Sequence, residues 1–280
     1  MRGACRGVGS VSEMRWSRPR RVFFPLLFML LTACSGRIET VEEVHATDER
    51  LIPGMTWHWQ LTGQLEKSVD VDMYDVDLFD TPQGVIEELH AAGRMVMCYF
   101  SAGSREDWRP DADLFAEEIL GRSLEGWEGE RWLDIRQLDL LAPILEARLD
   151  LAVAKGCDAV EPDNVDGFAN RTGFPLTYED QLAFNIWLAE EAHARGLAIV
   201  LKNNLEQVGD LLPYFDGALN EQCFRYDECE VLLPFIEAGK PVFGVEYELE
   251  PAAFCPQANA WGFSWMRKRR ALDAWAQPCW

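Results

Sequence analysis

Glu161, Asp163, Asn164 and Asp166 lie within six residues of one another, directly after the short apolar run 159–160. Neighbouring carboxylates repel one another and lose solvation when they are buried, so such a cluster needs a compensating reason. Carboxylates of this kind can act as general acid, general base or nucleophile, or they can bind a cation. The structural alternative is a polar loop that caps the next helix.

Similar polar residues recur where other predicted strands end. In a parallel barrel the C-terminal ends of all strands face one mouth, which is where active sites of this architecture lie. Helix caps alone do not explain polar groups at seven of eight such ends. The residues at these ends are Asp80, Tyr99 with Ser101, Asp134, Glu161 with Asp163, Lys202 with Asn203, Glu221 and Glu246.

Eight segments have the length and apolar content of strands, and most are separated by segments with helical periodicity. This alternation predicts an α/β fold, a single-domain (β/α)8 TIM barrel. A doubly wound open sheet is the alternative, weakened because no Gly-rich turn follows the first strand. The link between the first two strands is too short for a helix. The predicted strands are 55–61, 73–79, 95–100, 132–135, the start of 158–168, 197–201, 217–221 and 241–246, and the predicted helices are 82–92, 140–155, 178–195, 205–215 and 228–238.

Two carboxylates that face one small cavity suit the cleavage of a glycosidic bond. One protonates the leaving oxygen, and the other acts as a nucleophile or as a base for water. We predict Asp163 and Glu221 as this pair, from the fifth and seventh strand ends. A separation of about 5–5.5 Å predicts retention and roughly 6.5–9.5 Å predicts inversion. We expect the other carboxylates to raise the pKa of the member that stays protonated.

Six segments taken together resemble glycoside hydrolase family 114, the endo-α-1,4-polygalactosaminidases. The resemblance covers roughly residues 53–248, and the segments occur in order. It implies a barrel hydrolase without a cofactor, which cuts α-1,4-linked galactosamine polymers internally with retention, Asp163 as nucleophile and Glu221 as acid/base. The six segments are 74–80 (YDVDLFD), 96–103 (VMCYFSAG), 132–135 (WLDI), 156–166 (GCDAVEPDNVD), 201–203 (LKN) and 220–222 (NEQ).

The resemblance and the strand ends together predict the residues that bind the sugar. Trp57, Trp59, Tyr99 and Trp108 are candidates for stacking against sugar rings, although core packing is the expected role of at least two of them. The resemblance implies a sugar subsite lined by Asp80, Tyr99, Lys202 and Asn203, and the strand-end positions add Asp134, Glu161, Asp166, Glu246 and the aromatic Trp57.

The N-terminus has the pattern of an export signal. Arginines precede the apolar run 22–31, which is too short to span a bilayer and fits a secretory signal. Leu-Thr-Ala-Cys then matches a bacterial lipobox that ends at Cys34, and the following Ser is typical of sorting to the outer membrane. We therefore predict a signal peptide (1–33), a lipid on Cys34, a polar tether (34–52) and the barrel domain (53–280). Plain secretion is the alternative.

The charge of the exported part narrows the class of partner. The full chain carries a net charge of −21, and removal of the six Arg and one Glu of residues 1–33 leaves −26 on 247 residues. Such a protein repels nucleic acid and other polyanions and attracts cationic ligands such as partly deacetylated amino-sugar polysaccharides. We expect a monomer that touches the membrane only through its lipid. We interpret the basic run 267–270 as a solvated patch or an outer-barrel contact.

Six cysteines remain in the exported chain besides Cys34, an even number that suggests disulfides. Cys223 with Cys229 and Cys255 with Cys279 are the expected pairs, although spacing alone does not settle the connectivity. Cys98 and Cys157 lie in or beside predicted strands, where buried small apolar groups are the simpler interpretation.

Other chemistries find less support in the sequence. The four histidines show no paired metal-binding spacing, and no nucleophile elbow or phosphate loop occurs. A calcium site at Glu161, Asp163 and Asp166 is a minor alternative, so we predict no metal. Two further functions remain open: a non-catalytic surface module that retains polysaccharide, and a barrel hydrolase that acts on another glycan.

Overall fold

The computed structural model of the chain describes residues 51–280. The predicted signal peptide, Cys34 and residues 35–50 of the tether lie outside the described residues and remain predictions. Within the described range, no helix combines the length and the apolar character that a membrane crossing requires.

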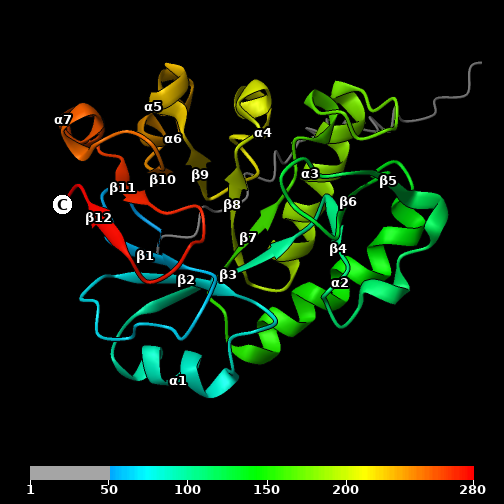
Figure 1. The fold of residues 1–280 in the computed structure, drawn as a ribbon, viewed down its shortest axis with the longest axis horizontal. Coiled ribbons are helices and arrows are strands. Elements are labelled where there is room, and N and C mark those ends of the chain that lie inside the picture. The colour runs from blue at the N-terminus through cyan, green and yellow to red at the C-terminus, as the bar shows by residue number, and fades with distance from the viewer. Residues whose placement is uncertain (1–50) are drawn as a thin grey trace, which may run out of the picture. The chain divides into compact units, whose positions relative to one another are not determined.

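Eight parallel strands form the main sheet of residues 51–280. The sheet curves so that its first and last parallel strands approach each other, which gives a nearly closed barrel (Figure 1). The two outer strands approach each other because Leu61 N donates to Leu272 O (3.0 Å) and Trp57 Nε1 donates to Ser264 O (2.9 Å). The predicted TIM-barrel class is therefore confirmed. The strands, in spatial order, are β1 (Trp57–Gln60), β2 (Met73–Asp77), β3 (Met95–Ser101), β7 (Ala159–Asp163), β8 (Ala198–Lys202), β9 (Gly217–Glu221), β10 (Val242–Glu246) and β11 (Ser264–Lys268), with β12 (Ala276–Pro278) antiparallel beside β11.

The prediction that residues 132–135 form a barrel strand is wrong. They overlap β6 (Glu130–Leu133), the middle strand of a small antiparallel sheet with β4 (Ser104–Glu106) and β5 (Leu120–Ser123). β3 pairs directly with β7, so no position is left in the barrel for β6. The eighth barrel strand is instead β11, which we did not predict, because the basic run 267–270 obscured the apolar residues just before it.

The helices follow the predicted order, but two of them are shorter than expected. The segments 205–215 and 228–238 each form a short 3-10 turn followed by one brief helix, since Pro213 and Pro234 cannot donate helical hydrogen bonds. Thr177 and Asp180 form a capping box at the start of the helix Tyr178–Ala194. In the described range the helices are α1 (Gln83–Ala91), α2 (Leu138–Lys155), α3 (Tyr178–Ala194), α4 (Val208–Leu211), α5 (Cys223–Tyr226), α6 (Leu233–Glu237) and α7 (Pro251–Trp261).

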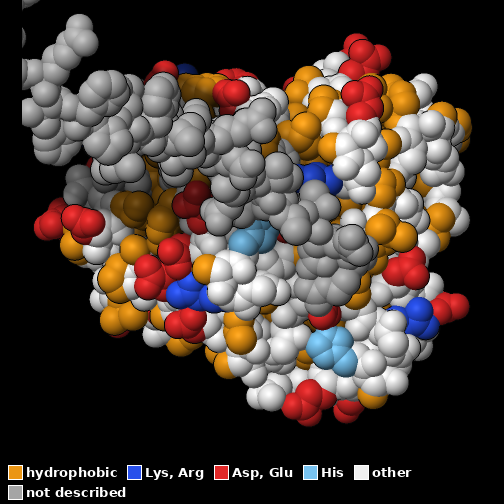
Figure 2. Space-filling view, turned by 180° about the vertical axis from the view of Figure 1, so that it is seen from behind, with side chains coloured by type: hydrophobic (Ala, Val, Ile, Leu, Met, Phe, Trp, Pro, Cys, Tyr) orange, Lys and Arg blue, Asp and Glu red, His pale blue; other side chains and the backbone are white. Residues whose placement is uncertain are grey.

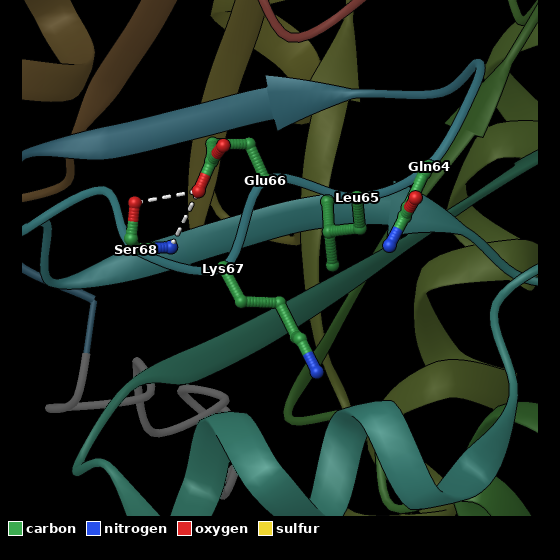
Figure 3. A pocket seen from close by; sticks show the side chains of 5 residues that line it. All are labelled: Gln64, Leu65, Glu66, Lys67 and Ser68. Atoms are coloured by element: carbon green, nitrogen blue, oxygen red, sulfur yellow. Dashed lines mark hydrogen bonds between the residues drawn. The ribbon is translucent and has the colours of Figure 1, made fainter.

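The link between β1 and β2 contains no helix, as expected. Figure 3 shows its residues 64–68, where the Glu66 carboxylate accepts from the backbone N–H (3.0 Å) and hydroxyl (2.5 Å) of Ser68. Lys67 extends toward α1 and pairs with Glu88. The hollow of about 550 Å³ at these five residues shares no residue with the large cavity described below.

Apolar side chains fill both faces of the barrel wall. The cluster inside the barrel includes Trp57, Trp59, Met97 and Phe243, while a larger cluster lies between the strands and the helices. Two faces are buried because side chains alternate along each strand. Acidic side chains are spread over the surface opposite to the view of Figure 1, as Figure 2 shows. This distribution agrees with the negative charge of the chain.

Three disulfides staple the barrel. Cys223–Cys229 and Cys255–Cys279 are bonded as expected. Cys98 and Cys157 also form a disulfide, so the interpretation of these two as free buried groups is wrong. Cys98 lies on β3 and Cys157 just before β7, so this bond ties together two adjacent strands that are separated by 59 residues in sequence.

We expect the Cys98–Cys157 disulfide to stabilise the fold more than Cys223–Cys229 does. The chain-entropy relation gives about 4 kcal/mol for the longer loop and about 2 kcal/mol for the shorter one. The loops span 59 and 6 residues. The free energy of unfolding of each double Cys→Ala variant, measured in guanidinium chloride, tests this. An equal or larger loss in the Cys223/Cys229 variant would contradict it.

Candidate active site

A cavity of about 1460 Å³ opens at the C-terminal ends of the strands. Asp163, Lys202 and Glu221 are the last residues of β7, β8 and β9, three strands that are neighbours in the sheet. Seven of the eleven predicted site residues line this cavity, which are Asp80, Tyr99, Asp163, Asp166, Lys202, Asn203 and Glu221.

The Lys202 ammonium lies among three carboxylates. Its Nζ is 2.6 Å from Glu161 Oε1, 3.3 Å from Asp163 Oδ1 and 3.5 Å from Glu221 Oε2. Burial of this side chain acts to lower its pKa, but Asp163, Glu161 and Glu221 together raise the pKa well above the usual value. Lys202 therefore remains charged.

This shared contact limits the separation of Asp163 and Glu221. Laid end to end, the 3.3 Å and 3.5 Å contacts of Lys202 allow at most about 6.8 Å between Asp163 Oδ1 and Glu221 Oε2. Both side chains reach the cavity, with exposed fractions of 20% and 26%. The two predicted carboxylates are therefore close enough to act on one bond.

Glu221 is held by several hydrogen bonds. The Tyr247 hydroxyl donates to Oε1 and Asn203 Nδ2 donates to Oε2 (3.2 Å), while Asn203 Oδ1 accepts from the Glu221 backbone N–H (2.9 Å). Burial acts to raise the pKa of Glu221, but Lys202, Tyr247 and Asn203 outweigh it and lower the pKa. The expectation that neighbouring carboxylates raise the pKa is therefore wrong for Glu221 in this structure.

Asp163 is positioned by the loop that follows β7. Tyr99 Oη donates to Oδ2 (3.1 Å), and the Asn164 backbone N–H donates to Oδ1 (2.8 Å). Asn164 has a φ of 62°, and its side chain donates to Ser101 Oγ (2.9 Å). A Cβ on Gly103 would lie 1.7 Å from Asn164 O, so only glycine allows the two loops to pack this closely.

Beneath the cavity, Glu161 forms the floor. It is fully buried, accepts from Trp59 Nε1 (3.1 Å) and binds Lys202. Burial raises the pKa of Glu161 to about 7, although Lys202 opposes this. Glu161 thus acts through Lys202 rather than lining the cavity itself.

Asp75, a residue we did not predict, lies next to Glu161 on this floor. It is fully buried on β2, and neither of its oxygens accepts a hydrogen bond from a described residue. Burial first, and then Glu161, raise the pKa of Asp75 well above its usual value. The raised pKa favours the protonated form of Asp75, which is the form that can donate a hydrogen bond to the neighbouring Glu161 carboxylate. The sequence signal that could have identified Asp75 was its alternation with Asp77 in the segment 74–80.

Four predicted site residues do not line the cavity. Asp134 pairs with Arg136 (2.7 Å), which lowers the pKa of Asp134. Glu246 accepts from Phe224 N (3.0 Å), and Trp57 packs inside the barrel. Glu161, the fourth, lies under Lys202. Asp134, Glu246 and Trp57 thus lie outside the lining of this cavity.

Several cavity residues lie away from the predicted strand ends, on loops or on the strands of the small β4–β6–β5 sheet. Among these, Glu130 accepts from Ser104 and Asn164, and burial first, with Asp163, raises its pKa to about 7. The basic run 267–270 is not purely an outer contact, since Lys268 is buried and Arg270 lines the cavity. The main unpredicted lining residues are Asp77, Glu106, Arg109, Arg122, Glu125, Trp127, Glu130, Trp132, Arg171, Tyr247 and Arg270.

Asp77 fixes the wall of the cavity near β2. Arg109 donates to both of its oxygens (2.9 and 2.6 Å) and also pairs with Glu106 (2.7 Å). Burial acts to lower the pKa of Arg109, but these carboxylates raise it. Asp80 also pairs with Arg109, at 3.7 Å, but is 79% exposed. In the described part of the chain, no group of three His, Cys, Asp or Glu residues is arranged to hold a metal ion.

Comparison with known proteins assigns the family. A sequence model of glycoside-hydrolase family GH114 matches residues 39–280. The chain belongs to this family. It is a glycoside hydrolase, and its barrel and carboxylate pair agree with that assignment.

Solved structures and one relative extend the comparison. The structure of Aspergillus fumigatus Ega3 in complex with galactosamine is 39% identical in sequence and has a TM-score of 0.80. The match covers 85% of this chain and 100% of the Ega3 chain. The glycoside hydrolase domain of PelA from Pseudomonas aeruginosa (TM-score 0.61, 16% identity, 80% and 98% covered) shares the fold. An uncharacterised protein of Deinococcus radiodurans is 28% identical over 301 aligned positions, which cover 89% of this chain and 97% of the relative.

We expect the free energy of unfolding to fall as pH rises from about 5 to 7. Burial is the largest cause that raises the pKa of Glu130, Glu161 and Glu246 to about 7 and of Asp166 to about 6. In this range the folded protein binds protons that the unfolded chain has lost, which favours folding at the lower pH. His58, whose pKa burial lowers, acts in the opposite direction.

Urea unfolding at intervals between pH 5 and pH 8 measures this effect. Glu246→Gln serves as a matched variant, because it removes one such group outside the cavity and should flatten the slope. Stability that rises with pH across this interval would contradict the expectation.

We expect Asp75→Asn to preserve more activity than Asp75→Leu. An amide is neutral and can donate to Glu161 as the protonated acid does, whereas leucine removes the donor and disturbs the Lys202 contact. A lost hydrogen bond to a charged group costs about 1.5–3 kcal/mol, or roughly tenfold or more in rate if it acts through Lys202.

Infrared difference spectra give a readout that does not depend on activity. The carbonyl band of a protonated carboxylic acid at neutral pH should disappear in Asp75→Asn. An unchanged spectrum would show that Asp75 is ionised and that its role is different.

Proposed function

We propose that this enzyme hydrolyses internal α-1,4 linkages of a galactosamine-containing polysaccharide, with retention of configuration. The observation that carries the proposal is the convergence of Asp163 and Glu221 on Lys202, which limits two of their oxygens to a separation of at most about 6.8 Å. That limit includes the spacing of about 5–5.5 Å typical of retaining enzymes. The likeness to Ega3, a structure in complex with galactosamine, supports the substrate class.

In the first step, Asp163 Oδ attacks the anomeric carbon while Glu221 gives its proton to the leaving glycosidic oxygen. The sugar is then bound to Asp163 as an ester, and the other half of the polymer leaves with the proton. In the second step, the ionised Glu221 takes a proton from water, whose oxygen attacks the anomeric carbon and releases Asp163. Lys202 contacts both carboxylates, at 3.3 Å from Asp163 and 3.5 Å from Glu221.

Glu221 has to gain a proton before the first step, although its pKa is lowered in this structure. A sugar ring over Glu221 excludes water and strengthens the burial effect, which acts to raise the pKa. The tyrosine and asparagine that hold Glu221 keep its carboxyl oriented as the charge changes. Substrate binding thus prepares the acid in this proposal.

The charges of the cavity favour a cationic sugar. Asp80, Asp166, Glu125 and Glu130 all line it, and they can attract and pair with ammonium groups of deacetylated galactosamine units. Arg270, which also lines it, is engaged by Glu248 (3.2 Å) and Gln222 (3.2 Å). Arg122 and Arg171 line the cavity too, but its eight Asp and Glu residues outnumber its five Lys and Arg residues, so the lining has an excess of acidic side chains.

We expect Asp163→Asn and Glu221→Gln each to fold normally and to lose hydrolysis of a deacetylated galactosamine polymer by at least ~10²-fold, the scale of a lost acid–base group. Release of reducing ends from the purified polymer measures the rate. Asp134→Asn is the matched control, because its carboxylate lies outside the cavity, and it should remain close to the wild type.

A wild-type rate in either variant would overturn the assignment of the pair. A panel of neutral, acidic and amino polysaccharides tests the substrate class separately. Cleavage of a neutral glycan alone would contradict the electrostatic argument but leave the carboxylate pair intact.

A further inference from the structure

The small sheet after β3 carries two tryptophans at the edge of the cavity. Trp108 follows β4 and is 51% exposed, while Trp127 lies in the β5–β6 hairpin and is 53% exposed. Both line the cavity. Within residues 51–280, neither indole has a ring contact with another aromatic side chain or a cation, or a hydrogen bond from its N–H.

The two tryptophans extend from one end of this sheet. Glu106 of β4 and Glu130 of β6 are register partners, and the Asp107 N–H donates to Gly129 O (3.0 Å). Gly129 has a φ of 87°, and a Cβ there would lie 2.5 Å from the Asp107 carboxylate. The loops that carry Trp108 and Trp127 are therefore locked together.

The two half-exposed indoles place apolar surface on one wall of the cavity, and apolar surface rimmed by polar residues is typical of ligand-binding grooves. The cavity of about 1460 Å³ also exceeds the 300–1,000 Å³ of a typical small-ligand pocket, so there is room for several sugar rings. Glu125, two residues before Trp127, is an exposed carboxylate that lines the same wall. An aromatic face beside a carboxylate suits a pyranose ring that carries an ammonium group.

We propose that Trp108 and Trp127 form a subsite at the cavity rim on which pyranose rings of the polymer stack, with Glu125 pairing with an amine of the same chain. The inference rests on the proposed function and deepens it. The subsite binds a part of the polymer away from the cleaved bond, which favours long chains over short ones. It therefore accounts for internal cleavage through binding at the rim.

The test compares chain lengths of one substrate. We expect Trp127→Ala, in the full chain, to lower the ratio of kcat/KM on long deacetylated galactosamine polymer to kcat/KM on its shortest cleaved oligosaccharide by about tenfold, as expected for one lost stacking contact. Trp108→Ala should act in the same direction, and Trp127→Phe should restore part of the ratio, because it restores an aromatic face.

Tyr226→Ala is the matched control, since Tyr226 is 63% exposed but does not line the cavity. It should leave the ratio unchanged. Binding of the polymer to Asp163→Asn, with and without Trp127→Ala, measures the subsite without turnover, and the double variant should bind about tenfold more weakly.

The outcomes separate the two proposals. If the wild type does not cleave the galactosamine polymer, the proposed function fails. If the wild type cleaves it but Trp127→Ala retains the wild-type ratio and polymer binding, only the rim subsite is overturned. An equal loss on long and short substrates would likewise overturn it, because it would indicate a general effect on folding or on the chemistry.

Discussion

The buried ammonium of Lys202 is the interaction on which the site depends. Glu161, Asp163 and Glu221 would repel one another across the end of the barrel without a cation among them. One lysine on β8, the strand between β7 and β9, contacts all three. It brings the two proposed catalytic carboxylates within reach of one bond. The same contact lowers the pKa of Glu221, so the acid role that we propose for this residue depends on the arrival of substrate.

Repulsion between buried carboxylates also governs Asp75 and Glu161, which lie beneath Lys202. Ionised Asp75 and Glu161 side by side in a buried site would carry a cost that one lysine cannot offset. Burial and Glu161 raise the pKa of Asp75, which favours the neutral form and removes one of those charges. The indole N–H of Trp59 donates to Glu161, and Glu161 in turn pairs with Lys202.

Long-range links fix the parts that surround this site. The Cys98–Cys157 disulfide joins β3 to the chain just before β7, and the small β4–β6–β5 sheet occupies the long stretch between those strands. That sheet holds Glu130 and the two rim tryptophans at the cavity. The site therefore combines a barrel mouth, with polar residues at strand ends, and a wall formed by the small β4–β6–β5 sheet.

Much of this arrangement is encoded locally. Apolar strand segments and helical periodicity predicted the barrel, and the polar strand ends predicted Asp163, Lys202 and Glu221, because parallel strands bring their C-terminal ends together. The failures have physical causes as well. Residues 132–135 have strand propensity, but propensity does not reveal which sheet a strand joins. The basic residues of β11 obscured its apolar start, because a run of basic residues is normally read as exposed. In the structure Lys268 is buried, and its ammonium donates a hydrogen bond to Asp273 O.

The sequence by itself determined the family resemblance, the fold class and the identity of the carboxylate pair, all of which depend on residue type and order along the chain. Only the tertiary structure decided which polar groups meet. Asp134 and Glu246 lie near strand termini yet pair outside the cavity, while Glu130 and Trp127 reach it from positions with no distinctive local pattern. The raised pKa of Asp75 and the lowered pKa of Glu221 were likewise decided there, because burial and charge proximity arise from contacts between distant segments.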